Sequence, residues 1–158
     1  MAADDSQRLL MEQPIDCDDP ATEDQWCMTA RESVVAYLAI EGFAHGEVGE
    51  WPAWHVAPVA SVRAIESLVE PGRVGWWVLY CDMPIDYVAG AGLVHPRDAM
   101  RAIAVRWKAY VVDAKAGTPL DEISFDGRVL PDDIIPLLQA RAEMLHTWAD
   151  DDEVWDGD

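Results

Sequence analysis

The segment that most constrains the fold is 74–81, which reads VGWWVLYC and is apolar at both alternating positions. Successive side chains of a strand point to opposite faces of a sheet, so a strand of this composition has to be covered on both faces. We therefore predict that it lies in the middle of a small sheet, with Trp76 and Trp77 on opposite faces. A strand over 59–67 precedes it, and a short third strand is expected near Tyr87.

The loop between the first two strands contains Glu70-Pro71-Gly72-Arg73. Proline followed by glycine at the two central positions is typical of a type II turn. Because that turn matches the twist of a hairpin poorly, we expect the loop to be wider than two residues.

Three helices are predicted to cover the sheet. The first, over 23–41, repeats apolar residues at helical intervals and has Thr22 as its expected N-cap. The second begins at Pro96 and has the clearest apolar face in the sequence, and the third begins at Pro131. An irregular or hairpin-like piece is expected over 123–129. The sequence thus predicts an α+β fold, with three helices packed on a small, mainly antiparallel sheet.

Acidic residues are concentrated at the two ends of the chain. The 158 residues contain 30 Asp and Glu against 11 Lys and Arg, which gives a formal charge of −19. Dense like charge with few apolar groups opposes ordering, so we predict an acidic, poorly ordered tail over 1–22 and an acidic tail over 150–158, on either side of a single domain over 23–149. This charge also argues against direct nucleic-acid binding.

The chain has no features of a membrane or secreted protein. No apolar run approaches the roughly 20 residues that a membrane span needs, and the first residues are acidic, unlike a secretion signal. Cys17, Cys27 and Cys81 show no paired spacing, which indicates free thiols in a reducing compartment. We expect a cytoplasmic protein without a membrane partner.

Several tryptophan-rich strings, taken together, resemble a bacterial family catalogued as domain of unknown function 4826. The resemblance covers roughly 24–150 and leaves the acidic ends outside it. It implies no activity, cofactor or catalytic residue. The strings are WPAWHVAP at 51–58, AIES at 64–67, VGWWV at 74–78, MPIDY at 83–87 and HPRDA at 95–99.

Four tryptophans lie on or beside the predicted hairpin: Trp51, Trp54, Trp76 and Trp77. Exposed tryptophan is enriched at the energetically dominant positions of protein interfaces, so these residues are candidates for contact with a partner. The alternative is that both sheet faces are covered and the indoles pack in the core. Self-association through an exposed tryptophan also stays open.

Two histidines and three acids are the candidates for a polar cluster: His55, Glu66, Asp82, Asp86 and His95. Such side chains could bind Zn²⁺ or Fe²⁺, with Glu66 as a general base on a metal-bound water. However, no HExxH or similar spacing supports the site. The alternative is that Asp82 and Asp86 cap a turn and that His95 merely precedes a helix.

The second helix is locally basic, with Arg97, Arg101, Arg106, Lys108 and Lys115. One interpretation is that it docks an acidic surface, either the C-terminal segment of this chain or that of a second copy. The other is a solvated outer face on which each ion pair contributes little.

No nucleophile motif, P-loop or GxGxxG occurs, so no catalytic residue and no cofactor is assigned. The leading hypothesis is a non-catalytic protein-binding domain, adaptor-like or immunity-like, whose partner has a basic surface. The alternatives are a metal-binding or hydrolytic enzyme that uses the polar cluster, and a nucleic-acid mimic that acts through its acidic tails.

Overall fold

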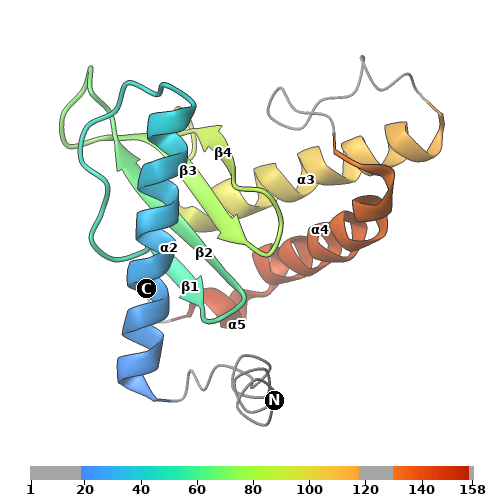
Figure 1. Ribbon diagram of the computed structural model, residues 1–158, viewed down its shortest axis with the longest axis horizontal. Coiled ribbons are helices and arrows are strands. Elements are labelled where there is room, and N and C mark those ends of the chain that lie inside the picture. The colour runs from blue at the N-terminus through green and yellow to red at the C-terminus, as the bar shows by residue number, and fades with distance from the viewer. Residues whose placement is uncertain (1–18, 118–129, 157–158) are drawn as a thin grey trace, which may run out of the picture.

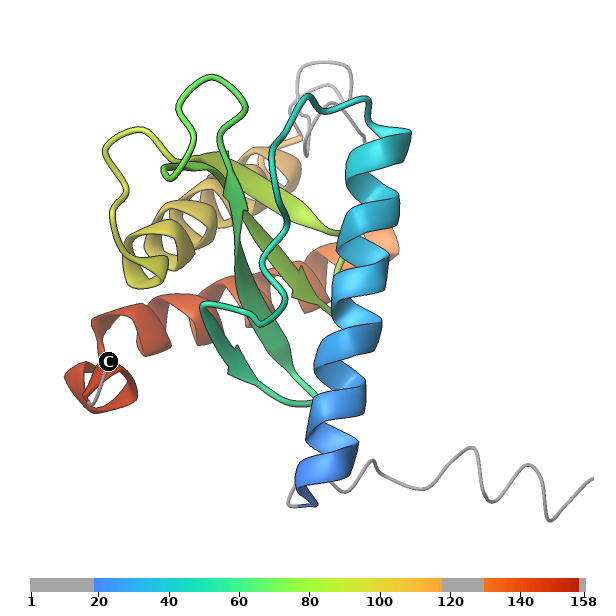
Figure 2. The ribbon, with the colours of Figure 1, turned by 90° about the vertical axis from the view of Figure 1, so that its left-hand side faces the viewer.

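The computed structural model describes residues 19–117 and 130–156. Within them, three long helices and one short helix pack on a four-stranded antiparallel sheet, which confirms the predicted α+β class. Helix α2 (Pro20–Ile40) covers one face of the sheet, and helices α3 (Pro96–Lys115) and α4 (Ile135–Asp150) cover the other (Figures 1 and 2). None of the described helices is both long and apolar enough to cross a lipid bilayer.

The sheet has the order β1-β2-β3-β4. Its strands are β1 (Trp54–Val56), β2 (Ala60–Glu66), β3 (Val74–Cys81) and β4 (Asp86–Ala89). The apolar strand β3 is interior, as predicted, and β4 is the expected third strand. Strand β1 was not predicted, because three residues are too few to show an alternating pattern.

The loop between β2 and β3 contains the predicted type II turn. The amide of Arg73 donates to the carbonyl of Glu70 over 3.1 Å, and Gly72 has a φ of 85°. A side chain is disfavoured at that φ, which is why glycine follows proline here. The turn sits inside a wider loop, closed by the amide of Ser67 donating to the Arg73 carbonyl over 2.8 Å.

Helix α2 begins earlier than predicted. Asp19 is the N-cap residue and Pro20 occupies the first turn, where the missing amide hydrogen costs nothing. The predicted cap, Thr22, instead donates from Oγ1 to the Asp19 carboxylate over 3.0 Å. The prediction of the cap is therefore wrong, because proline at the first position moves the start of the helix upstream.

Helix α3 begins at Pro96 as predicted. A 3₁₀ turn, η1 (Asp132–Ile134), separates Pro131 from α4, so Pro131 precedes a tighter turn rather than the α-helix itself. The hairpin-like piece expected over 123–129 lies outside the described residues.

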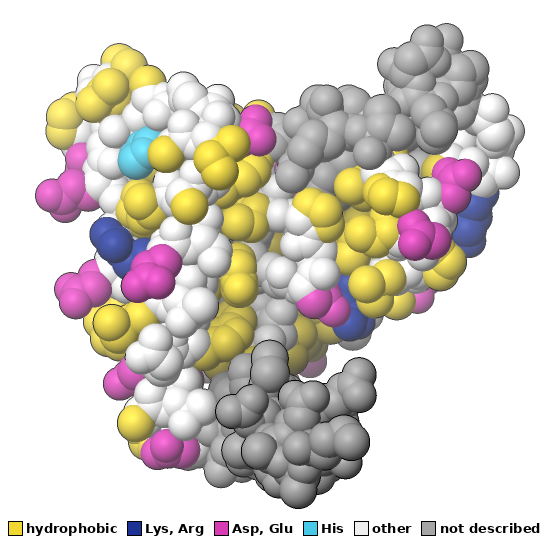
Figure 3. Space-filling view, viewed as in Figure 1, with side chains coloured by type: hydrophobic (Ala, Val, Ile, Leu, Met, Phe, Trp, Pro, Cys, Tyr) yellow, Lys and Arg dark blue, Asp and Glu magenta, His cyan; other side chains and the backbone are white. Residues whose placement is uncertain are grey.

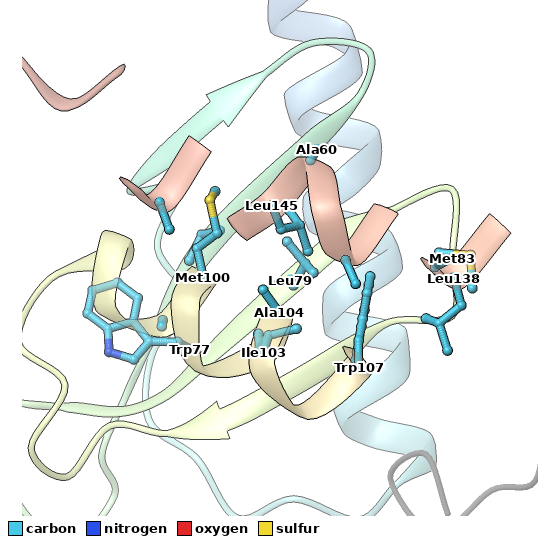
Figure 4. Packing of buried hydrophobic residues seen from close by; sticks show 14 of the residues in the cluster. Ala60, Trp77, Leu79, Met83, Met100, Ile103, Ala104, Trp107, Leu138 and Leu145 are labelled. Atoms are coloured by element: carbon cyan, nitrogen blue, oxygen red, sulfur yellow. The ribbon is translucent and has the colours of Figure 1, made fainter. Parts of the chain in front are cut away.

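Two apolar layers hold the sheet between the helices. The larger lies under α3 and α4 and includes Trp77 and Leu79 of β3 and Trp107 of α3 (Figure 4). The smaller lies under α2 and includes Val78 of β3. The alternation of β3 therefore supplies both layers, with Trp76 and Trp77 on opposite faces as predicted.

The C-terminal segment differs from the acidic tail expected over 150–158. A short helix, α5 (Asp152–Trp155), buries Trp155 to 7% exposure against Trp54, with ring centroids 5.3 Å apart. Asp152 pairs with Arg97 over 2.7 Å and Asp150 with Arg101 over 3.3 Å. The basic helix thus docks the chain's own C-terminal segment, because a buried indole offsets the cost of ordering the acids. The expected N-terminal tail lies outside the described residues up to residue 18.

Candidate functional site

The structure does not bring the five residues of the expected polar cluster together. His55 Nε2 lies 2.6 Å from Glu23 Oε1 and ties β1 to α2. Glu66 accepts from the amide of Gly72 over 3.4 Å, and His95 is the N-cap of α3, accepting from the amide of Arg97 over 3.0 Å. Within residues 19–117 and 130–156, no group of three or more His, Cys, Asp or Glu could hold a metal ion.

Asp82 and Asp86 have opposite environments. Asp86 is fully buried and accepts from Trp107 Nε1 over 2.7 Å, from the amide of Tyr87 over 2.9 Å, and pairs with Arg106 over 2.7 Å. Asp82 is exposed and forms a forked pair with Arg141, with distances of 2.8 and 2.6 Å. The hydrogen bonds from that guanidinium lower the pKa of Asp82 below its usual value.

Of the four candidate tryptophans, three contribute to packing. Trp54 and Trp77 are buried, and the Trp77 indole donates to the Leu93 carbonyl over 2.9 Å. Trp76 is half-buried against the ring of Phe43, with centroids 5.1 Å apart. Trp51 is different, since 52% of its surface is exposed.

Trp51 lies on a groove of about 640 Å³ between α2 and the segment 47–51, which we call the Trp51 groove. Its facing wall on α2 carries Met28, which is 53% exposed. The groove is lined by Met28, Arg31, Glu32, Glu47, Val48, Gly49, Glu50 and Trp51. Two large apolar side chains are therefore presented to solvent across one concave surface.

A strap over 46–53 forms the outer wall of the groove and follows the free side of β2. The amide of Gly46 donates to the Glu66 carbonyl over 2.9 Å, and that of Ala53 to the Val62 carbonyl over 2.9 Å. Between Val48, which is opposite Ile65, and Trp54, which is opposite Val62, the strap advances six residues while β2 recedes three. The additional residues of the strap form a wide bulge, and Trp51 lies within this bulge. Bulges of this kind redirect side chains and are common next to functional sites.

Two arginines fix the bulge in place. Arg63 of β2 donates from Nη1 to the carbonyls of Gly49 and Glu50, over 2.6 and 3.2 Å. Its Nη2 donates to the carbonyl of Cys27 in α2 over 3.2 Å, so one guanidinium joins helix, sheet and strap. Arg31 of α2 adds a bond to the Val48 carbonyl over 3.2 Å.

The guanidinium of Arg63 is fully buried, and its hydrogen bonds to described residues all go to backbone carbonyls. Burial lowers the pKa of Arg63, and the nearby positive charge of Arg31 lowers it further. An arginine nevertheless stays charged in a protein. This side chain therefore supports the groove wall from inside without offering its charge to a ligand.

The rim of the Trp51 groove is acidic. Glu32, Glu47 and Glu50 are all exposed, and in the part of the chain that the structure describes none of them forms an ion pair. Acidic and hydrophobic side chains lie next to one another along the α2 side of the molecule (Figure 3). The groove therefore combines exposed apolar surface with unpaired negative charge.

Sequence reasoning named Trp51 but missed Met28 and both arginines. A signal for Arg63 was present, because it is the one charged residue inside the otherwise uncharged stretch 59–65. A charge at an interior strand position is expected only where it finds hydrogen-bond partners. Nothing local to Met28 distinguishes it from a core methionine, since its exposure depends on where the strap runs.

No curated protein and no solved structure shows significant similarity to this chain. A family model matches residues 20–155, a span that contains α2, the strap, the whole sheet and α3 to α5. The chain therefore belongs to the family described as "Domain of unknown function (DUF4826)", in agreement with the resemblance of its tryptophan-rich strings.

Proposed function

We propose that this chain is a non-catalytic protein-binding domain, and that its Trp51 groove takes an exposed basic segment of a partner protein. The observation that carries the proposal is a half-exposed indole beside three carboxylates that have no ion-pair partner among the described residues. Tryptophan is enriched at the residues that dominate interface energetics, and its ring face attracts cations.

The chemistry of the groove favours lysine or arginine flanked by apolar residues. Trp51 and Met28 offer apolar area to the stem of such a side chain, and the glutamates offer acceptors to its charged head. The strongly acidic chain also attracts a basic partner over a distance, which raises the rate of association. Because Arg31 and Arg63 already hold the strap in place, binding a partner requires little further loss of conformational entropy.

The chemistry of Cys81 supports a binding role in the cytoplasm. Its thiol is free, which suits a reducing compartment. Burial raises the pKa of Cys81 to about 11, so it is not a nucleophile at neutral pH. An adaptor-like or immunity-like role fits a domain of this kind.

The test begins with a photo-crosslinking amino acid, p-benzoylphenylalanine, placed at Met28 of the full chain in cells. The same residue placed at Val105, an exposed position on α3, is the control. We expect a partner that crosslinks from the groove position and not from the control, through a segment rich in lysine or arginine. Equal crosslinking from both positions, or a target segment without basic residues, would contradict the proposal.

The purified partner is then titrated by calorimetry against the wild type, Trp51→Ala and a Glu47→Gln, Glu50→Gln double variant. Loss of a dominant contact tryptophan is expected to raise Kd by about 30-fold or more. The double variant should bind more weakly and with less dependence on salt. The matched control is Val112→Ala, an exposed residue on α3, which should bind like the wild type. Unchanged affinity of Trp51→Ala would refute the assignment of the groove.

A further inference from the structure

A second groove, of about 750 Å³, lies where the β2–β3 loop meets the connection from β4 to α3. Trp76 and Val74 of β3 line it, and we call it the Trp76 groove. Small residues of the connection from β4 to α3 also line it, including Gly90 and Gly92. This groove shares no lining residue with the Trp51 groove.

Three aliphatic side chains beside the Trp76 groove are strongly exposed. Leu68 and Val69 of the β2–β3 loop are 61% and 89% exposed, and Val94 of the β4–α3 connection is 89% exposed. Hydrophobic side chains gather over the β2–β3 loop, at the upper left of Figure 3. Single exposed aliphatics are ordinary, but several beside one concavity mark a contact surface.

The charges on the Trp76 groove are balanced. Glu70 and Arg73 both line it, both are exposed, and neither has an ion-pair partner among the described residues. The Trp51 groove has an acidic rim instead. This surface therefore has an apolar projection next to a groove, and an acid next to a base. Each feature has its matching feature on the same surface, so the surface is complementary to a second copy of itself.

We propose that two copies of this chain associate through the Trp76 groove about a two-fold axis. The Leu68-Val69 loop of each copy enters the groove of the other, and Glu70 of each copy pairs with Arg73 of the other. An interface with two-fold symmetry needs one patch that is complementary to itself, which is what this patch offers. The proposal does not depend on the function assigned to the Trp51 groove.

The response to salt concentration distinguishes association through the Trp76 groove from binding at the Trp51 groove. Each copy carries a formal charge of −19, so two copies repel each other at low ionic strength. Screening relieves that repulsion while apolar contact remains, so self-association should strengthen as salt is raised. Binding of a basic partner to the Trp51 groove should weaken under the same change. Failure of one proposal is therefore distinguishable from failure of the other.

The experiment is sedimentation velocity on the full chain at about 100 µM, where an association with a micromolar Kd is nearly complete. We expect a dimer that becomes more populated from low to moderate salt. Val69→Asp should weaken it by about 100-fold, because the interface would bury an unpaired carboxylate. Val112→Asp places the same charge on α3, at a valine that is 65% exposed, and should leave the dimer intact.

A charge exchange makes the test specific for the two-fold arrangement. Glu70→Arg alone and Arg73→Glu alone should each weaken the dimer, because each places like charges opposite one another. The double variant restores both pairs and should dimerise to within about 3-fold of the wild type if the pairs act locally. A monomeric wild type at every salt concentration, a dimer insensitive to Val69→Asp, or a double variant no better than the single variants would overturn the proposal. Circular dichroism of each variant checks that it is folded.

Discussion

Replacing Asp86 by alanine should destabilise the fold far more than the same change at Asp82, although the two acids flank one short turn. The Asp86 carboxylate is fully buried and accepts hydrogen bonds from three donors, whereas Asp82 is exposed and pairs with Arg141. The sequence offers no distinction between them. The comparison therefore isolates burial and hydrogen bonding from charge.

The expected loss of stability in Asp86→Ala follows from the hydrogen-bond donors that lose their acceptor. The indole of Trp107 is fully buried, and a bond to a charged acceptor contributes about 2 kcal/mol. The amide of Tyr87 adds about 1 kcal/mol. The guanidinium of Arg106 is half-exposed and water can replace its partner, so we count nothing for it. We expect Asp86→Ala to lower the free energy of unfolding by about 3 kcal/mol, and Asp82→Ala by less than about 1 kcal/mol.

The assay is urea denaturation of the full chain followed by far-ultraviolet circular dichroism, with both slope and midpoint compared between variants. Asp86→Asn keeps one carbonyl acceptor and should fall between Asp86→Ala and the wild type. A double-mutant cycle with Trp107→Phe should give a coupling energy of about 1 kcal/mol or more. A coupling near zero, or equal losses for the two alanine variants, would refute this reasoning.

Four further outcomes follow from single side chains. Ser61→Ala should raise the free energy of unfolding by about 1 kcal/mol in urea titration, because the buried hydroxyl has no hydrogen-bond partner among the described residues. Trp155→Ala should lower the thermal midpoint through a loss of about 3 kcal/mol, because the indole packs in the larger apolar layer. Arg63→Met should speed hydrogen exchange in the strap by about 10-fold or more while β3 stays protected, because the strap carbonyls lose their charged donors. The folded-state pKa of Asp82 lies below its unfolded value, so its small contribution is present at neutral pH and is lost as the pH falls through the lowered pKa. The stability difference between the wild type and Asp82→Asn should therefore shrink on acidification.

Elements that bury a continuous stripe of residues were predictable from the sequence. Strand β3 carries a pattern long enough to fix both its type and its limits, and the pattern of helix α3 fixes its type and its first residue. The type II turn was predictable for a different reason, because proline followed by glycine restricts the backbone locally. These elements sufficed for the α+β class.

The site was only partly predictable, because it depends on where distant segments meet. Trp51 and Trp54 share one tryptophan-rich string, yet one is half-exposed and the other is buried against Trp155, about a hundred residues later. Asp86 is buried because Trp107 of α3 reaches it. No local pattern encodes such contacts. Strand β1 and the strap were missed for the same reason, since β2 defines them and their own residues do not.

The burial of Arg63 is explained better by the geometry of the Trp51 groove than by the stability of the sheet. An aliphatic side chain at that position would extend the smaller apolar layer and would not require a charge to be removed from water. It would also leave the carbonyls of the bulge without their donor, so the strap could straighten along β2 and turn Trp51 out of its present position. An apolar residue could therefore serve the stability of the sheet but not the geometry of the Trp51 groove. A buried cation whose hydrogen bonds to described residues all go to backbone carbonyls is best understood as a support for the groove. Amide exchange in Arg63→Met examines that support directly.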